Sequence, residues 1–267
     1  EGSLTLPAQA LGNHTLSVRA GDGAGNWDAS PATASFNVGT FGPTIDTSYS
    51  TTVAASHPNA TITVNNPSGD LKDATFSLPD GFWGSRRAVP LCSTAAADAG
   101  TCPAASQIGT ASFSTRTDDN TTVNFTAAIH MAEGSNGAIA RLTTQGLPSV
   151  GGTFQANMSF DMRSPLEEGQ VISVENPKGL DTVATDYPRQ TSTGVNLHTR
   201  TLTLSLVGAG DPDSAAPLLY APSACDLRSS DGSFVSYENN IGDDSEPFQA
   251  TNCAAVGFNP SIVQSYS

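Results

Sequence analysis

The stretch TVNFTAAIHM, residues 122–131, decides the fold. Val123, Phe125, Ala127, Ile129 and Met131 recur at every second position, and mostly polar residues stand between them. Successive side chains of a β-strand point to opposite faces, so this spacing predicts a strand with one buried face. A helix would instead need apolar residues at every third or fourth position.

The same alternation recurs along the chain, and each run is bounded by Gly, Pro, Asn or Asp. Only residues 93–100 suit a short helix. A chain built almost entirely of strands must bury one sheet against another, so we expect an all-β fold, a β-sandwich of Ig-like or jelly-roll-like type. The apolar positions of the further runs are Leu16, Val18 and Ala20; Ala34, Phe36 and Val38; Ala74, Phe76 and Leu78; Phe154, Ala156, Met158, Phe160 and Met162; and Leu202, Leu204 and Leu206.

Composition argues against two classes of partner. Only 13% of the residues are charged, with 25 acidic against 11 basic side chains and a net charge of −14. Such a chain repels phosphate backbones and carries no basic stripe, so we expect no nucleic acid partner. No apolar run reaches the roughly 20 residues that a membrane-spanning helix needs, so we expect no membrane span in this segment.

The four cysteines fall into two local pairs, Cys92 with Cys102 and Cys225 with Cys253. Neither pair has the second CxxC or the neighbouring histidine typical of a zinc site, so two disulfides are expected, with free buried thiols as the alternative. Disulfides would place the protein outside the cytoplasm, secreted or at the cell surface. Between Cys225 and Cys253 the sequence is polar and rich in Gly and Asp, and it is interpreted as an excursion.

One ten-residue stretch occurs twice. FGPTIDTSYS, residues 41–50, and FNPSIVQSYS, residues 258–267, share six identical positions, and Thr44 is matched by Ser261. We interpret both stretches as the same first strand of a repeated module. The predicted assembly residues are Phe41, Pro43, Ile45 and Tyr49, with Phe258, Pro260, Ile262 and Tyr266.

The beginning of the chain resembles the last hairpin of bacterial Ig-like repeats, which commonly reads G-x-H-T-x-x-V-x-A-x-D-x-x-G-N. The matching residues are Gly12, His14, Thr15, Val18, Ala20, Asp22, Gly25 and Asn26. The resemblance implies that residues 1–39 are the C-terminal strands of an Ig-like domain. Since such a sandwich needs about seven strands, this segment is incomplete alone.

Residues 40–256 are expected to form a large β-sandwich, and residues 257–267 the first strand of the next repeat or a strand donated to a neighbour. The central block carries a set of Pro, Gly and Cys positions in a fixed order, namely Pro79, Gly81, Val89, Pro90, Cys92, Cys102, Pro103, Ser106, Gln107, Gly109, Pro222, Cys225, Asp226, Cys253, Phe258, Pro260 and Ser261. By these residues it resembles a module of large, multidomain, secreted bacterial proteins. The resemblance implies a bacterial, extracellular location and an architecture but no enzymatic activity.

No catalytic residue is predicted, because the chain lacks G-x-S-x-G and H-E-x-x-H motifs, and no cysteine remains after pairing. We expect no cofactor. Calcium is the inorganic ligand that the oxygen-rich loops suit best, at Asp22, Asn26 and Asp28. The alternative is that these residues only shape a turn.

Two function classes follow from these observations. The favoured one is an extracellular structural protein whose copies join head to tail in a stalk, adhesin or filament, either as a covalent tandem chain or by β-strand complementation. The alternative is a glycan-binding or polysaccharide-processing module of a surface protein. Its glycan site would be Trp83 with Arg86 and Arg87, unless Trp83 serves a structural turn.

Overall fold

A computed structural model describes residues 9–134, 140–145, 159–163, 181–185, 187, 189–190, 194–208 and 217–256. The chain divides into two compact units, Glu1–Phe41 and Gly42–Ser267.

The first unit contains one antiparallel hairpin of β1 (Gly12–Val18) and β2 (Ala32–Val38). The register places His14, Leu16 and Val18 opposite Phe36, Ala34 and Ala32, so one face of the hairpin is largely apolar. His14 stacks on Phe36 with 5.4 Å between the ring centroids. Val18 is nevertheless 55% exposed, because a two-stranded ribbon has no second layer to cover this face.

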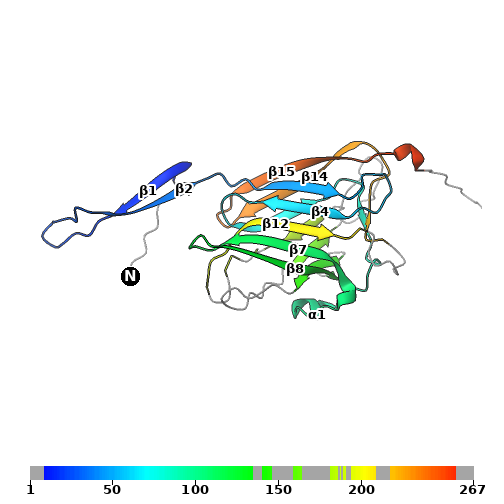
Figure 1. Cartoon of the computed structure of the whole chain (residues 1–267), viewed down its shortest axis with the longest axis horizontal. Helices are drawn as coiled ribbons and strands as arrows, with labels where there is room; N and C mark the ends of the chain where they lie inside the picture. The colour runs from blue at the N-terminus through cyan, green and yellow to red at the C-terminus, as the bar shows by residue number, and fades with distance from the viewer. Residues whose placement is uncertain are drawn as a thin grey trace, which may run out of the picture. The chain divides into compact units, whose positions relative to one another are not determined.

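Eleven strands of the second unit form one sheet in the order β15-β14-β5-β11-β10-β9-β8-β7-β12-β4-β3, with every neighbouring pair antiparallel. β4, β12, β7 and β8 lie side by side in one layer (Figure 1). The strands are β3 (Thr44–Tyr49), β4 (Ala60–Asn65), β5 (Leu71–Ser77), β7 (Gln107–Arg116), β8 (Thr122–Glu133), β9 (Ala140–Gln145), β10 (Ser159–Arg163), β11 (Asp181–Ala184), β12 (His198–Leu206), β14 (Leu227–Ser236) and β15 (Ile241–Gln249).

The sheet folds over on itself, so that β3 and β15, the two ends of the strand order, contact each other. The result is the all-β sandwich that the alternating sequence predicts. The stretch at residues 122–131 lies in β8, where Phe125, Ala127, Ile129 and Met131 are buried. In β12 the leucines at 202, 204 and 206 point into the core, and Thr201, Thr203 and Ser205 alternate with them.

Two sequence-based expectations need comment. The polar segment between Cys225 and Cys253 is not an irregular excursion: it contains the hairpin of β14 and β15, paired from Leu227 to Val235. The run predicted from Phe154 to Met162 is described only in part, because Phe154, Ala156 and Met158 lie outside the described residues. Phe160 and Met162 lie in β10, which pairs with β9 and β11.

Helical structure is brief, as expected. The helix predicted at residues 93–100 is α1 (Thr94–Asp98), and the side chain of Ser93 caps it by accepting from the Ala96 N–H. Two single turns of 3-10 helix, at Ala104–Ser106 and Cys253–Ala255, complete the helical elements of the described residues. A small separate ribbon pairs β6 (Trp83–Gly84) with β13 (Leu219–Tyr220).

Candidate functional site: the seat of strand β3

The first copy of the repeated stretch forms β3 and its approach. β3 pairs along its whole length with β4, from Thr44 opposite Asn65 to Tyr49 opposite Ala60. Ile45 is only 4% exposed and Pro43 is buried, whereas Thr44, Asp46 and Ser48 are exposed. Phe41 is the last residue of the first unit. The alternation that defines the strand therefore also separates its core side chains from its surface side chains.

On the flank opposite β4, side chains of the β14–β15 hairpin hold the strand. The backbone N–H of Ile45 donates to the carboxylate of Asp244 at 2.8 Å. The hydroxyls of Thr47 and Tyr49 each lie 3.1 Å from the Ser230 hydroxyl. Beyond the strand, Val53 forms a parallel bridge with Thr251. We call the surroundings of this strand, which are β4 and the contacting side chains of β14 and β15, the β3 seat.

An aromatic cluster closes one end of the β3 seat. The Tyr49 ring lies 4.9 Å from the rings of both Phe82 and Phe248, and the last two are 5.2 Å apart. Phe82 reaches this cluster from a tight turn, where its N–H donates to the Pro79 carbonyl and Gly81 has a φ of +88°. A glycine suits that backbone conformation, which explains the Pro-x-Gly pattern of the sequence. Burial raises the pKa of the Tyr49 hydroxyl, and its bond with Ser230 offsets part of that shift.

The second copy of the stretch, with Phe258, Pro260, Ile262 and Tyr266, lies outside the described residues. Its sequence can still be compared with what β3 buries. The two buried residues of the first copy, Pro43 and Ile45, are both identical in the second, as is Tyr49 of the aromatic cluster. Among the four positions that differ, Thr44 and Asp46 are exposed.

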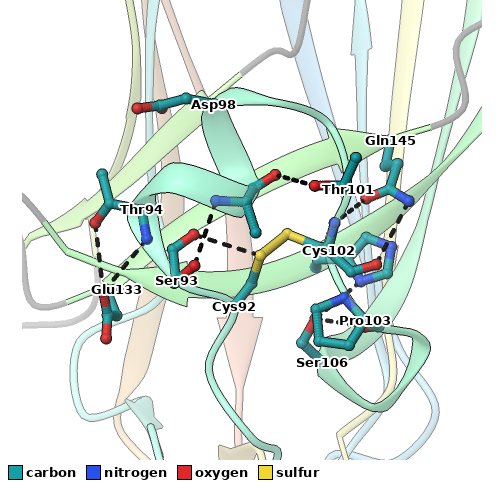
Figure 2. Close-up of a disulfide and its surroundings, with 12 residues drawn as sticks. Cys92, Ser93, Thr94, Asp98, Thr101, Cys102, Pro103, Ser106, Glu133 and Gln145 are labelled. Atoms are coloured by element: carbon teal, nitrogen blue, oxygen red, sulfur yellow. Dashed lines mark hydrogen bonds between the residues drawn. A yellow bond between two sulfur atoms is a disulfide. The ribbon is translucent and has the colours of Figure 1, made fainter.

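Both predicted cysteine pairs are bonded as disulfides, so the alternative of free thiols is wrong. Cys92–Cys102 closes the segment that carries α1 (Figure 2). The segment lies against β8 and β9: Cys92 exchanges backbone hydrogen bonds with Met131 and Glu133, and the Gln145 side chain accepts from the Cys102 N–H at 2.7 Å. Figure 2 shows Glu133 at the start of α1, where it accepts from the Thr94 N–H and hydroxyl.

The second disulfide, Cys225–Cys253, joins the segment before β14 to the segment after β15. It thus ties together the two ends of the hairpin that holds β3. Two disulfides are compatible with an extracellular location. In the parts of the chain that the structure describes, no helix has the length and apolarity to cross a membrane.

The predicted calcium loop lies in the first unit. One Asp22 oxygen accepts from the backbone N–H groups of Ala24 and Asn26, and the other accepts from the Asn26 side chain. Asp28 accepts from the Ser30 N–H. These bonds shape the turn, and the bonds from Asn26 lower the pKa of Asp22. Among the described residues no cluster of three or more His, Cys, Asp or Glu side chains is arranged to hold a metal ion.

The predicted glycan residues lie on the small β6–β13 ribbon and just after it. Trp83 is 53% exposed and pairs across the ribbon with Tyr220. Arg86 and Arg87 are exposed in the following turn. Trp83 is therefore half-exposed while its backbone pairs in the ribbon, which leaves both of its predicted roles open.

A charged cluster was missed by sequence reasoning. His198 Nδ1 lies 2.6 Å from Asp70, and its Nε2 lies 3.1 Å from Asp118. Burial acts to lower the pKa of His198, but the hydrogen bonds to Asp70 and Asp118 outweigh it and raise the pKa. Asp118 and Asp70 lie 80 and 128 positions before His198 in the sequence, so no local motif joins the three residues. We call this arrangement the His198 clamp; it connects the β7–β8 turn to the first residue of β12.

No protein-family model matches the sequence, and comparisons with curated proteins and with solved structures find no match.

Proposed function

We propose that this protein is an extracellular, bacterial structural protein, a β-sandwich subunit of a surface stalk, adhesin or filament whose copies join head to tail. One observation carries the proposal: the stretch at residues 258–267 repeats the residues that β3 buries in its seat, namely Pro43 and Ile45 with Tyr49 of the aromatic cluster. A second strand with this pattern suits a second seat of the same kind.

The β3 seat favours a covalent tandem chain over strand exchange. In the structure the chain fills this seat with its own β3, which makes a full ladder with β4. A strand donated by a neighbour would have to displace it, whereas a strand that begins a following copy displaces nothing. We therefore propose residues 258–267 as the first strand of a following sandwich. This version of head-to-tail assembly needs no vacant edge.

The first unit supports the same architecture. Its hairpin presents Leu16, Val18 and Phe36 on one face, and a two-stranded ribbon cannot bury that face by itself. We propose that the missing strands come from a preceding part of the same chain or from a neighbouring copy, which completes an Ig-like sandwich. The two disulfides and the rarity of charged side chains suit a module whose role is length, rigidity and protease resistance.

Exposed Trp83 supports a second candidate function, glycan binding or polysaccharide processing. A half-exposed indole beside Arg86 and Arg87 has the chemistry of a sugar-stacking platform. Binding of cell-wall glycan that Trp83→Ala abolishes would support this function, and unchanged binding would remove Trp83 from it.

Electron microscopy of the native secreted material tests the structural proposal. Globules on a regular axial repeat are expected, and isolated single sandwiches would contradict it. Deleting residues 258–267 then separates its two versions. Strand exchange predicts the loss of polymers, whereas a covalent tandem predicts that the thread persists and only the following sandwich is destabilised.

A further inference from the structure

A cavity of about 460 Å³ opens where the ends of β3, β4, β7, β8 and β12 lie together. It lies apart from the Trp83 ribbon, and its lining includes Thr44, the first residue of β3. Its lining has two basic side chains and no acidic one, in a chain of net charge −14. The residues that matter here are Asn65, Asn66, Ser114, Arg116, Thr122 and Arg200.

A β-bulge brings Arg200 to this cavity. The register between β12 and β7 shifts between Thr199 and Thr201, which makes Arg200 the extra residue. Bulges redirect a side chain that regular alternation would send to the other face. The Asn66 N–H donates to the Arg200 carbonyl at 2.8 Å, and the Arg200 guanidinium donates to the Gly69 carbonyl at 3.1 Å. The bulge and the arginine are therefore both anchored.

The two guanidinium groups lie close enough to influence each other. Burial lowers the pKa of Arg200, and the positive charge of Arg116 lowers it further. The negative charge of Asp70 acts to raise that pKa and offsets part of the shift. Arg116 donates to the Asn120 side chain at 3.2 Å. A guanidinium has five N–H donors in a planar fork, so both arginines keep donors for an incoming carboxylate. The nearby carboxylates, Asp70 and Asp118, are each hydrogen bonded to His198.

Asn66 braces the bulge that carries Arg200. It is only 2% exposed, and its Nδ2 donates to the carbonyls of Gly69 and Thr199, which fixes the orientation of the amide. Its Oδ1 is itself buried and has no hydrogen-bond partner among the described residues, so it offers no open contact to a ligand. The donors that remain for a ligand are those of the two arginines, which suit a carboxylate.

A row of uncharged polar side chains crosses the surface beside the cavity, next to the exposed Asp46 of β3. Residues from five adjacent strands face one another in register there: Thr44, Asn65, Thr201, Ser114 and Asn124. Hydroxyl and amide side chains both donate and accept hydrogen bonds, which suits the hydroxyls of neighbouring sugars better than an apolar or strongly charged partner.

We propose that this cavity binds the uronate residue of an acidic polysaccharide. Arg116 and Arg200 pair with the carboxylate, and adjoining sugars lie over the uncharged row. The inference goes beyond the structural role proposed above and does not depend on it. It would give the subunit a means of holding a polysaccharide matrix or capsule.

Isothermal titration of the full 267-residue chain with trigalacturonate, a mannuronate trisaccharide and a hyaluronan tetrasaccharide tests the proposal. At least one should bind, and its affinity should fall as salt rises. The methyl ester of the saccharide that binds should lose at least about tenfold in affinity, because the guanidinium–carboxylate pair is lost.

Arg200→Met and Arg116→Met should each weaken binding at least about tenfold, by the same loss of charge pairing. The matched control is Arg19→Met, which removes an exposed arginine of the first unit and should leave the affinity unchanged. Arg116→Met keeps the test valid if Arg200→Met, at the bulge, fails to fold.

Three results would overturn the proposal. The first is that none of the three saccharides binds at millimolar concentration. The second is that a folded Arg116→Met protein binds as the unaltered chain does. The third is that sodium sulfate binds while the saccharides do not, which would make the cavity a simple anion site.

Discussion

The backbone N–H of Ile45 donates to the carboxylate of Asp244 across 2.8 Å. Ile45 lies on β3 and Asp244 on β15, the two strands at opposite ends of the sheet order. The bond therefore joins the ends of a sheet that folds over on itself. It also fastens β3 on the flank that does not pair with β4.

Replacing Asp244 tests this closure. Asp244→Ala should lower the free energy of unfolding by about 1–3 kcal/mol, since it leaves the Ile45 N–H without its charged acceptor. The neighbouring Asp243 is exposed, so Asp243→Ala should change that free energy by no more than about 0.5 kcal/mol. Chemical denaturation of both variants decides the point, and equal effects would contradict the role given to Asp244.

Gly232 tests the packing behind β3. A Cβ atom there would lie 2.7 Å from Cζ of Phe234, a fully buried ring, and 3.5 Å from Cβ of Ile45. Gly232→Ala should therefore cost about 1–3 kcal/mol through overpacking. Gly42→Ala is the control, because a Cβ at Gly42 meets nothing within 4 Å. A Gly232→Ala protein that unfolds at the same denaturant concentration as the parent would refute the packing argument.

The His198 clamp predicts a dependence of stability on pH. The pKa of His198 is raised in the folded state. The stability that His198 contributes is therefore complete below its unfolded-state pKa of about 6.5, and it is lost as the pH rises through the folded-state pKa. Asp70, Asp118 and Arg200 are the charged groups that act on it. The difference in unfolding free energy between the parent chain and His198→Gln should therefore shrink from pH 6 to pH 9. If the unfolding free energies of the two proteins keep a constant difference over this range, the proposed role of His198 is contradicted.

The Cys92–Cys102 disulfide should stabilise the segment that carries α1. Replacing both cysteines by serine should lower the free energy of unfolding by about 2–3 kcal/mol, because the cross-link restricts a short loop in the unfolded chain. Protease cleavage within residues 93–101 should also accelerate. If neither stability nor cleavage changes, the contacts of Cys92 with β8 hold this segment without the bond.

How much the sequence predicts depends on what each strand buries. β8 and β12 place large apolar residues at every second position, so their alternation is visible. In β14 and β15 the alternation is hidden. Their inward positions include Ser230, Gly232 and Ser236, and only Phe234 and Phe248 among them are large and apolar. Their pairing comes from register and tertiary context, which propensity does not record.

The candidate sites divide in the same way. The β3 stretch was found because it is repeated, and the disulfides because their cysteines are close in sequence. The His198 clamp and the Arg116–Arg200 cavity join residues that are far apart in the sequence. In addition, the bulge at Arg200 changes the face to which strict alternation would assign that side chain. Such sites need the fold before they become visible.

Strand complementation tests the central claim, that residues 258–267 are equivalent to β3, most directly. A variant lacking both residues 1–50 and residues 258–267 is mixed with synthetic peptides, and its unfolding transition is measured. The peptide of residues 41–50 should restore the transition, and the peptide of residues 258–267 should restore it as well, whereas that peptide with Ile262→Asp and Tyr266→Ala should not. Restoration by the first peptide alone would contradict the equivalence and, with it, the tandem architecture.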